Sequence, residues 1–270
     1  MPELPEVETV ARGLARAVAG KTIESVTVSL AKMVQAPGGV AFAAALRGER
    51  VESVGRRGKY VVMRLRSGRS LVTSLRMTGR LVLQREGDPD FPGTHAVLHY
   101  TDGTRLSFAD VRTFGRMRLV EPDEPWDAAL GIEPLSPGFT QQVFIGMLSG
   151  RTTPIKALLL DQHRIAGIGN IYACEALWAA RIRPGRPSKA LTKPAILRLH
   201  HAIRDVLTRA TEMRGSSVDD YVDADGLRGG FQNVLSVYGK LGEPCPRCGA
   251  PIVRTVLAQR GTWWCRSCQR

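Results

Sequence analysis

Long apolar runs and dispersed cysteines are both absent from this sequence of 270 residues. No stretch approaches the roughly 18 consecutive apolar residues of a membrane-spanning helix, and the acidic start MPELPEVETV lacks a signal-peptide pattern. Four of the five cysteines lie between residues 245 and 268, which favours metal binding over disulfides. Cys174 stands alone on the apolar side of a helical segment and is interpreted as packing. We therefore expect a cytoplasmic protein with no membrane partner.

Acidic side chains are scarce relative to basic ones. The chain has 25 Asp and Glu against 38 Lys and Arg, a net charge of +13. Such an excess favours a polyanionic partner, with nucleic acid as the first candidate. A basic surface also serves membrane binding or solubility, so charge alone leaves those alternatives open.

The apolar pattern changes along the chain. Helical spacing between residues 5 and 19 predicts an opening helix, and β-rich runs over 22–120 predict antiparallel hairpins in a two-layer sandwich. The proline-rich stretch that follows is typical of a linker. Helical spacing then returns in the segments 141–149, 154–161, 170–180 and 193–213. We expect an α+β multidomain chain with a β-sandwich at 1–121, a linker at 122–139, a helical domain at 140–235 and a cysteine unit at 236–270.

Two CxxC pairs, Cys245-Pro-Arg-Cys248 and Cys265-Arg-Ser-Cys268, close the chain. Four thiolates at this spacing can bind zinc tetrahedrally and leave no open position for catalysis. The runs IVRTVL and TWWC can pair as a hairpin with its tip at Gln259-Arg260-Gly261, and a hairpin this short needs the metal for stability. We expect one structural zinc ion, with Arg260 projecting from the tip. A zinc ribbon used only for stability or protein contacts is the alternative.

Two further motifs are ambiguous by themselves. Gly167-Ile168-Gly169-Asn170 precedes a helical segment, where backbone amides can bind a phosphate, although an ordinary helix–helix turn has the same pattern. At the N-terminus, removal of Met1 would leave Pro2 with a secondary amine that can attack an aldehyde-like sugar carbon, helped by a neighbouring carboxylate. A proline–glutamate helix start explains the same residues.

Taken together, these motifs resemble the formamidopyrimidine-DNA glycosylase family, and its bacterial oxidised-purine branch more than its endonuclease VIII branch. The resemblance covers the whole chain. Its motifs are MPELPEVETV, RRGKY at 56–60, LRMTG at 75–79, DVRTFGR at 110–116, LGIEPL at 130–135, IKALLLDQ at 155–162, IAGIGNIYACEALW at 165–178, VYGKLGEPCPRCG and AQRGTWWCRSC.

The resemblance implies an N-terminal antiparallel β-sandwich with an opening helix, a helix-two-turns-helix domain, and a C-terminal zinc-finger β-hairpin. DNA would lie in a cleft between the domains. The implied partner is double-stranded DNA containing oxidised bases or abasic sites, bound by a monomer associated with a bacterial nucleoid.

Four catalytic roles are implied by the resemblance. The amine of Pro2 would attack C1′ of the damaged nucleoside, and Glu3 would protonate the opening sugar. Lys59, on the RRGKY strand, would transfer protons and contact phosphate while the two flanking phosphates are eliminated. Arg260 would hold those phosphates and assist the second elimination.

Three residues match the family's intercalation set. Met77 would be an apolar plug, Arg112 a hydrogen-bond partner of the orphaned cytosine, and Phe114 an aromatic wedge. Met77 and Phe114 could instead be ordinary core residues.

Other positions match contacts to the DNA or to the damaged base. His95, Lys156 and Asn170 match residues that contact the DNA backbone, with Lys156 the weakest match because surface lysines are usually only solvated. Glu6 resembles the glutamate of the lesion pocket, and residues 215–233 correspond to the loop that closes over an oxidised purine.

The chain departs from the family pattern at four positions. Ser74 stands where many relatives have histidine, which removes a phosphate donor of larger reach. Val111 and Thr113 replace a proline and an arginine, and Arg214 replaces a glycine before the lesion loop. We expect these changes to affect which lesions are preferred and how fast they are processed. The nucleophile and the metal ligands are intact.

Two rival functions remain. One is an oxidised-pyrimidine glycosylase of the endonuclease VIII type, which has the same fold. The other is a catalytically silent zinc-finger protein that binds damaged DNA, for which loss of Pro2, Glu3 or Lys59 would be expected.

Overall fold

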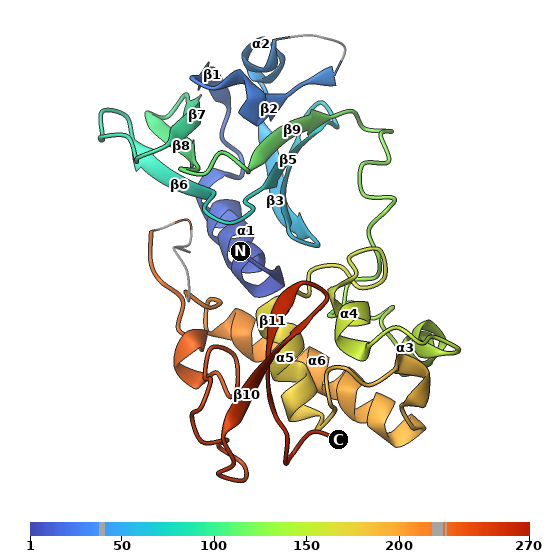
Figure 1. Ribbon diagram of the computed structural model, residues 1–270. Coiled ribbons are helices and arrows are strands. Elements are labelled where there is room, and N and C mark those ends of the chain that lie inside the picture. Colours follow the sequence, from blue (N-terminus) through green and yellow to red (C-terminus); the bar gives the residue numbers. More distant parts are fainter. Residues whose placement is uncertain (38–40, 218–223, 225) are drawn as a thin grey trace. The chain divides into compact units, whose positions relative to one another are not determined.

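The computed structural model describes residues 1–37, 41–217, 224 and 226–270. The chain divides into two compact units (Figure 1). The first unit comprises Met1–Ala128 and Met213–Gly230, and the second comprises Ala129–Glu212 and Phe231–Arg270. Residues 213–230, which the sequence pattern placed in the range 140–235, thus belong to the first unit.

The chain opens with helix α1 (Leu4–Val18), as the spacing predicted. Pro5 and Glu6 stand in its first turn, where a proline costs no hydrogen bond and an acidic group favours the helix dipole. Its buried face includes Leu14, and Gly20 follows the last turn in the left-handed conformation with a φ of 85°. The local sequence therefore accounts for both ends of the helix.

Two sheets make up the rest of the first unit (Figure 1). The four-stranded sheet has the order β1 (Ile23–Val28), β7 (Thr94–Tyr100), β8 (Thr104–Ala109), β6 (Arg80–Arg85). The five-stranded sheet has the order β2 (Val34–Gln35), β9 (Arg116–Val120), β5 (Ser70–Ser74), β4 (Tyr60–Leu65), β3 (Val51–Arg57).

The predicted antiparallel pairing is confirmed for these strands with one exception. The short strand β2 pairs in parallel with β9. It follows the 3-10 helix η1 (Ala31–Met33) and precedes the short helix α2 (Phe42–Leu46), so it joins the sheet edge without a hairpin turn. The sequence pattern does not reveal such a two-residue strand.

One apolar core joins α1 to both sheets. It includes Leu14 of α1, Leu71 of β5, Leu98 of β7 and Phe108 of β8. The alternation of side chains along the strands directs these residues inward. A separate apolar cluster of Val62, Val72 and Val120, with Tyr60 and Trp126 packed against it, lies on the other face of the five-stranded sheet.

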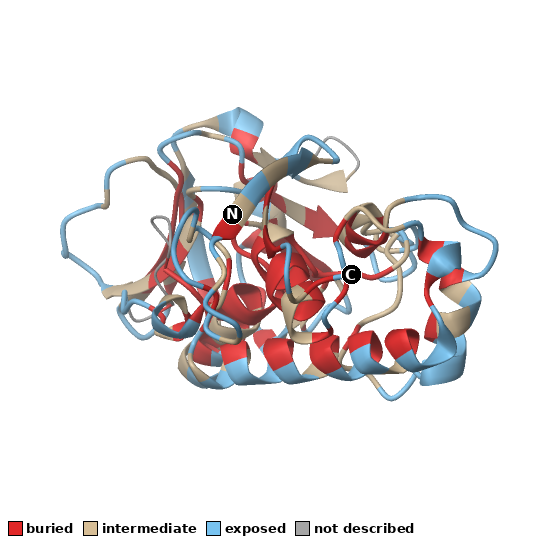
Figure 2. Ribbon diagram, turned by 60° about the horizontal axis from the view of Figure 1, so that its bottom comes forward, coloured by how far each residue is buried: buried red, intermediate tan, exposed pale blue. Residues whose placement is uncertain are grey.

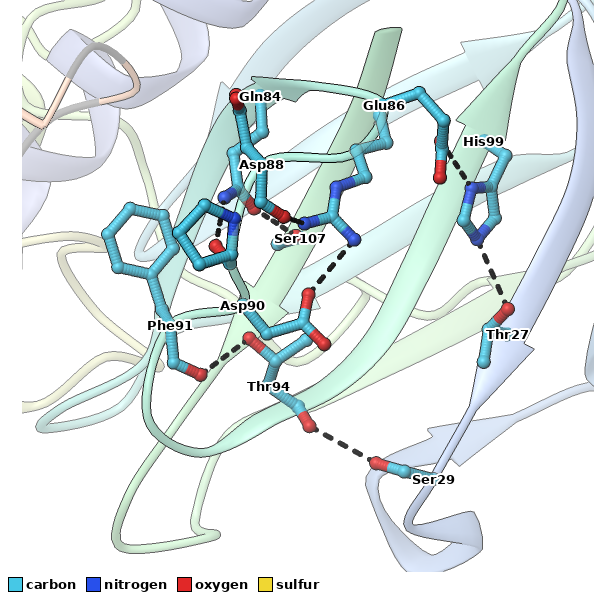
Figure 3. Close-up of polar contacts among 12 residues, drawn as sticks. Thr27, Ser29, Gln84, Glu86, Asp88, Asp90, Phe91, Thr94, His99 and Ser107 are labelled. Carbon is cyan, nitrogen blue, oxygen red and sulfur yellow. Dashed lines mark hydrogen bonds and ion pairs between the residues drawn. The ribbon is translucent and has the colours of Figure 1, made fainter. Parts of the chain in front are cut away.

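The connection from β6 to β7 is held to the four-stranded sheet by side-chain bonds (Figure 3). Arg105 of β8 donates to the carbonyl oxygen of Asp88 and pairs with Asp90 at 2.9 Å. Thr94 Oγ1 donates to the carbonyl oxygen of Phe91 at 2.8 Å. These contacts hold the start of β7, the strand that carries His95.

The second unit is helical. Its helices are α3 (Gln141–Leu148), α4 (Ile155–Leu160), α5 (Asn170–Ala179) and α6 (Lys193–Glu212), with 3-10 turns η3 (Ser188–Ala190) and η4 (Phe231–Val234). Each α-helix lies within one residue of its predicted bounds. Along α6, buried residues such as Leu199 and Ile203 alternate with exposed ones at helical spacing (Figure 2). None of the helices in the described ranges has the length and apolar character needed to span a bilayer.

The chain ends in a hairpin of β10 (Ile252–Leu257) and β11 (Arg260–Cys265). Its turn consists of Ala258 and Gln259, both with positive φ, which is the two-residue turn that matches strand twist. The predicted tip at Gln259-Arg260-Gly261 was therefore wrong by one residue. Arg260 pairs with Leu257 as the first residue of β11.

Candidate active site and zinc centre

The N-terminal segment is buried up to its first residue. Pro2 and Glu3 are buried, whereas Met1 is 39% exposed. The backbone amide of Glu3 donates to Glu6 Oε2 at 2.8 Å, which closes a capping box at the start of α1. The Pro2 nitrogen is therefore held in a fixed place. Met1, which occupies that nitrogen through a peptide bond, is accessible to solvent.

Glu6 also binds the base of the predicted lesion loop. Its Oε1 accepts a hydrogen bond from the backbone amide of Ser216 at 2.7 Å. A Cβ on Gly215, whose φ is 78°, would lie 2.7 Å from the same oxygen. Only glycine fits there without displacing the carboxylate. The start of α1 and the start of the loop are thus brought together by one buried side chain.

The two ends of the loop also meet. Ser217 Oγ accepts from the amide of Gly229 at 2.9 Å, and a Cβ on Gly229 would lie 2.3 Å from the carbonyl oxygen of Gly215. Arg214, which replaces a glycine, has a φ of 63°, a conformation that favours glycine. Within the predicted loop 215–233, residues 218–223 and 225 lie outside the described residues.

Lys59 lies in a turn and not on a strand, which corrects the sequence interpretation. Gly58 and Lys59 form the two-residue connection from β3 to β4, and Gly58 has a φ of 57°. Arg56 holds this turn by donating to the carbonyl oxygen of Gly58 at 2.9 Å. Arg56 also pairs with Glu8 of α1 at 3.0 Å. The turn that carries Lys59 is thus attached to α1, the helix that begins directly after Pro2 and Glu3.

The three predicted intercalation residues lie on surface turns. Met77 is 40% exposed in the turn after β5, and Phe114 is 51% exposed in the loop from β8 to β9. The guanidinium of Arg112 lies 5.0 Å from the centroid of the Phe114 ring. The alternative of ordinary core residues is therefore wrong for Met77 and Phe114.

Asp110 organises both of these turns, and sequence reasoning missed it. Its Oδ1 accepts from Thr78 Oγ1 and, at 3.1 Å, from the amide of Arg112. Its Oδ2 accepts from the amides of Phe114 at 2.8 Å and Gly115 at 2.6 Å. Asp110 is 1% exposed. One buried carboxylate therefore joins the turn with Met77 to the loop with Arg112 and Phe114.

The same loop contains strained backbone. Thr113 has a φ of 54°, which is rare for a β-branched residue, and its amide donates to the carbonyl oxygen of Asp110 at 3.0 Å. His95 Nε2 lies 3.0 Å from that carbonyl oxygen. Since a carbonyl only accepts, Nε2 carries the proton and Nδ1 is an acceptor in the neutral ring. His95 thus supports the loop directly.

Replacement Asp110→Asn is expected to destabilise the protein by about 2–3 kcal/mol at pH 7, because an amide NH₂ cannot accept from the two amides that face Oδ2. Burial raises the pKa of Asp110, but its hydrogen bonds lower the pKa by more than burial raises it. The pKa of Asp110 therefore lies below the ordinary value. The stabilisation is therefore complete above about pH 4 and is lost as the pH falls through the folded pKa.

Denaturant unfolding at pH 7 and at pH 3 measures this effect, with the exposed Asp123→Asn as control. The difference between wild type and Asp110→Asn should shrink at the lower pH. Equal stability of the two asparagine variants at pH 7 would contradict the role of Asp110.

Lys156 is completely buried, which corrects its interpretation as a surface lysine. Its Nζ donates to Asn170 Oδ1 at 2.6 Å, to Thr262 Oγ1 at 2.6 Å and to the carbonyl oxygen of Gly261 at 3.1 Å. Asn170 Nδ2 donates to the same carbonyl at 2.9 Å. Lys156 and Asn170 therefore hold strand β11 directly beside Arg260.

Replacement Lys156→Met is expected to destabilise the second unit by about 2–4 kcal/mol, since the acceptors Asn170 Oδ1 and Thr262 Oγ1 lose the charged donor that binds them. Chemical denaturation measures the effect. The exposed Lys189→Met is the control, and equal behaviour of the two variants would exclude the anchoring role.

The four cysteines form a zinc site. All four sulfur atoms lie within 4.8 Å of one another, with Cys245 and Cys268 3.9 Å apart and Cys248 and Cys265 3.5 Å apart. Tetrahedral zinc with bonds of about 2.3 Å requires sulfur separations of about 3.8 Å, so the four thiolates fit the ion.

Side chains around the cysteines support the ligands. Trp178 Nε1 donates to Cys245 Sγ at 3.4 Å, and the guanidinium of Arg247 lies 4.1 Å from the Trp178 ring centroid. Burial raises the pKa of Cys245, but this bond and backbone amides lower it more, to about 6. Cys174 is buried in the same apolar cluster, which confirms its packing role.

Glu175, also missed from the sequence, fixes the segment that leads to the cysteines. It accepts from the amides of Ser236, Val237 and Tyr238, each at 2.9 Å. Burial raises the pKa of Glu175 although these bonds oppose the shift. An acidic residue within the apolar run IYACEALW was the available signal.

A two-sheet unit that opens with a capped helix, a helical unit and a four-cysteine hairpin define a multidomain zinc-finger protein. Profile comparison assigns each part. The formamidopyrimidine-DNA glycosylase N-terminal domain matches residues 1–117, the H2TH domain of the same enzymes matches 130–222, and the zinc finger found in FPG and IleRS matches 242–270. The chain belongs to the formamidopyrimidine-DNA glycosylase family.

Individual relatives agree with this assignment over the full chain. The formamidopyrimidine-DNA glycosylase of Chloroflexus aggregans is 48% identical, covering 100% of this chain and 98% of the relative. The crystal structure of MutM (Fpg) from Thermus thermophilus is 42% identical with a TM-score of 0.89, covering 99% and 98%. A complex of Lactococcus lactis Fpg mutant G226P with Fapy-dG containing DNA is 36% identical with a TM-score of 0.93, covering 100% of both.

Proposed function

We propose that the protein is a bifunctional DNA glycosylase and AP lyase of base excision repair that excises oxidised purines through a Schiff base on Pro2. The observation that carries the proposal is the double contact of Glu6. One of its oxygens binds the amide of Glu3 and the other binds the amide of Ser216. The candidate nucleophile and the base of the candidate lesion loop therefore belong to one compact unit.

The first phase is removal of the base. Loss of Met1 turns the Pro2 nitrogen into an amine, whose neutral form attacks C1′ of the everted nucleotide. The bond from C1′ to the base breaks, Glu3 supplies a proton as the sugar ring opens, and an iminium ion joins Pro2 to the sugar. Glu6 lines the pocket for the departing base, together with the loop that begins at Gly215.

The second phase is cleavage of the strand. A proton leaves C2′ and the 3′ phosphate is expelled, and a second elimination expels the 5′ phosphate and leaves a one-nucleotide gap. Lys59, in the turn attached to α1 by Arg56, transfers protons in this phase. Arg260 holds the flanking phosphates, with Lys156 and Asn170 anchoring its strand.

Base eversion requires groups that fill the space left in the duplex. Met77 and Phe114 are exposed apolar side chains on turns held by Asp110, which suits insertion between bases. Arg112, beside the Phe114 ring, bonds the base opposite the lesion. His95 supports this loop and contacts the DNA backbone next to it.

The substrate class follows from the family and the basic charge. Lactococcus lactis relatives have been solved with Fapy-dG containing DNA and with DNA containing an abasic site. A relative has also been solved with an oxidised pyrimidine containing DNA. We propose that this chain acts as a monomer on double-stranded DNA in the bacterial cytoplasm, at the nucleoid, with oxidised purines as its main substrates.

Borohydride trapping and cleavage on matched duplexes test this function. Duplexes with 8-oxoguanine opposite cytosine should be trapped and cut faster than duplexes with thymine glycol, and undamaged DNA should not react. Faster reaction with thymine glycol would identify an oxidised-pyrimidine enzyme. Binding to all damaged duplexes without trapping would identify a catalytically silent DNA-binding protein.

A further inference from the structure

A hollow of about 430 Å³ lies in the first unit, where three segments of the chain meet. Its lining comes from the segment between α2 and β3, from the turn between β4 and β5, and from Thr22 just before β1. The amide of Ile23 donates to the carbonyl oxygen of Glu49 at 2.8 Å, and the amide of Arg66 donates to the carbonyl oxygen of Arg50 at 2.9 Å. The walls of the hollow are therefore fixed to one another.

Three exposed arginines surround the hollow, namely Arg47, Arg50 and Arg66. Over the described part of the chain, none of their side chains makes a hydrogen bond or an ion pair. The acidic residue of the lining, Glu49, is 9% exposed and pairs with Arg69 at 2.5 Å. Because the charge of Glu49 is already compensated, the three arginines leave the hollow with an uncompensated positive charge.

The hollow lies at the far end of α1 from Pro2. The helix has 15 residues and is therefore about 22 Å long. Just after its last turn, the amide of Gly20 donates to the carbonyl oxygen of Val51, the residue that follows Arg50. Helix α2, which leads into the hollow, and the start of α1 accordingly lie at opposite ends of the first unit (Figure 1).

The turns of the five-stranded sheet are separated in the same way. Strand β4 runs from the turn with Lys59 to Arg66, and β5 runs back toward the turn with Met77. The turns with Lys59 and Met77 thus share one end of the sheet, and the hollow lies at the other, about 20 Å away over the six residues of β4. A duplex held at the first end leaves the hollow open.

The chemistry of the lining selects among anions. The described residues that line the hollow include no apolar or aromatic side chain, so a nucleotide base or an acyl chain finds no contact surface there. The volume is that of a site for a ligand of many atoms, which is more than a single inorganic ion needs. Guanidinium groups bind carboxylates through two parallel hydrogen bonds. Several carboxylates on one flexible chain therefore match arginines that come from separate segments.

We propose that this hollow binds an acidic peptide segment of a partner protein, with Arg47, Arg50 and Arg66 pairing with its carboxylates. The site is separate from the residues assigned to catalysis and to DNA. The partner is therefore held on the enzyme while DNA occupies the other end of the first unit.

Binding of a fluorescein-labelled poly-aspartate peptide, followed by anisotropy, tests the site. The protein is first saturated with a duplex that contains a tetrahydrofuran abasic analogue, so that the DNA-binding surface is occupied. The variant with Arg47→Gln, Arg50→Gln and Arg66→Gln should bind the peptide about tenfold more weakly than wild type. The matched control removes three exposed charges from α6 and should bind the peptide as wild type does; its changes are Lys193→Gln, Arg198→Gln and Arg209→Gln. Unchanged affinity for the duplex shows that both variants are folded.

Four results would overturn the proposal. Equal peptide affinity of the two triple variants would show that only net charge matters. Displacement of the peptide by the duplex would place it on the DNA-binding surface, and displacement by an equal concentration of inorganic phosphate would identify a small-anion site. Binding of a second duplex that the three arginine changes abolish would make DNA the ligand. If wild type binds no tetrahydrofuran duplex, the proposed function fails, and the same titration without DNA still decides this proposal.

Discussion

Protein with a short peptide fused before Pro2 is expected to give no borohydride-trapped complex with DNA containing 8-oxoguanine opposite cytosine. The fused residue converts the Pro2 nitrogen into an amide, whose lone pair is delocalised into the carbonyl group and cannot attack C1′. The rate of base excision should fall by at least about a thousandfold, the scale seen when a nucleophile is removed. Gel analysis of trapped complexes and single-turnover excision measure the two effects.

The structure supplies the controls for this experiment. Pro2 and Glu3 are buried at the start of α1, but Met1 is 39% exposed, so an extension can leave the fold unchanged. The same peptide fused after Arg270 should have no effect on trapping. Retained binding to tetrahydrofuran duplexes would show that the blocked protein is folded. Undiminished trapping with the N-terminal extension would rule out Pro2 as the nucleophile.

Removal of zinc is expected to unfold the C-terminal hairpin and abolish strand cleavage. Two strands alone are at best marginally stable, whereas structural zinc contributes about 10 kcal/mol or more of apparent binding free energy. Arg260 and the contacts of Gly261 and Thr262 with Lys156 lie on β11, so they are lost with the metal. Chelation, or the replacement Cys265→Ser, should therefore stop the elimination steps.

Zinc content and cleavage must be measured on the same samples. Trp263 and Trp264, on β11, report unfolding of the hairpin by fluorescence. Cys174→Ala is the matched control, since Cys174 is buried beside the site and is not a ligand. That variant should keep one zinc ion per chain. Full cleavage by metal-free protein would show that the hairpin is not needed for the lyase phase.

The C-terminal hairpin is held by two kinds of contact, of which the sequence predicted one, the metal site, and not the other, the buried Lys156. The two CxxC pairs predicted the metal site because ligand spacing is a local property. The role of Lys156 was not predictable in this way, because its partners Gly261 and Thr262 are distant in sequence. A lysine on a short helix is usually solvated, and only the packing shows that this one is buried.

Local signals accounted for the elements themselves. The helix α1, the four helices of the second unit and the β-rich part follow from apolar spacing and from proline and glycine at the ends. The turn at Ala258 and Gln259 was placed one residue too late, since neither residue is a typical turn former. The parallel pairing of β2 had no local signal, because strand direction depends on the route of the chain.

By itself, the sequence determined the family, the metal ligands and the identity of the candidate nucleophile, because these depend on residue types at short spacing. Only the tertiary structure decided which groups hold that site in place. Glu6 joins the start of α1 to Ser216, and Asp110 joins the turns with Met77 and Phe114. A buried carboxylate must find donors wherever the fold brings them, and these donors come from segments far apart in the chain.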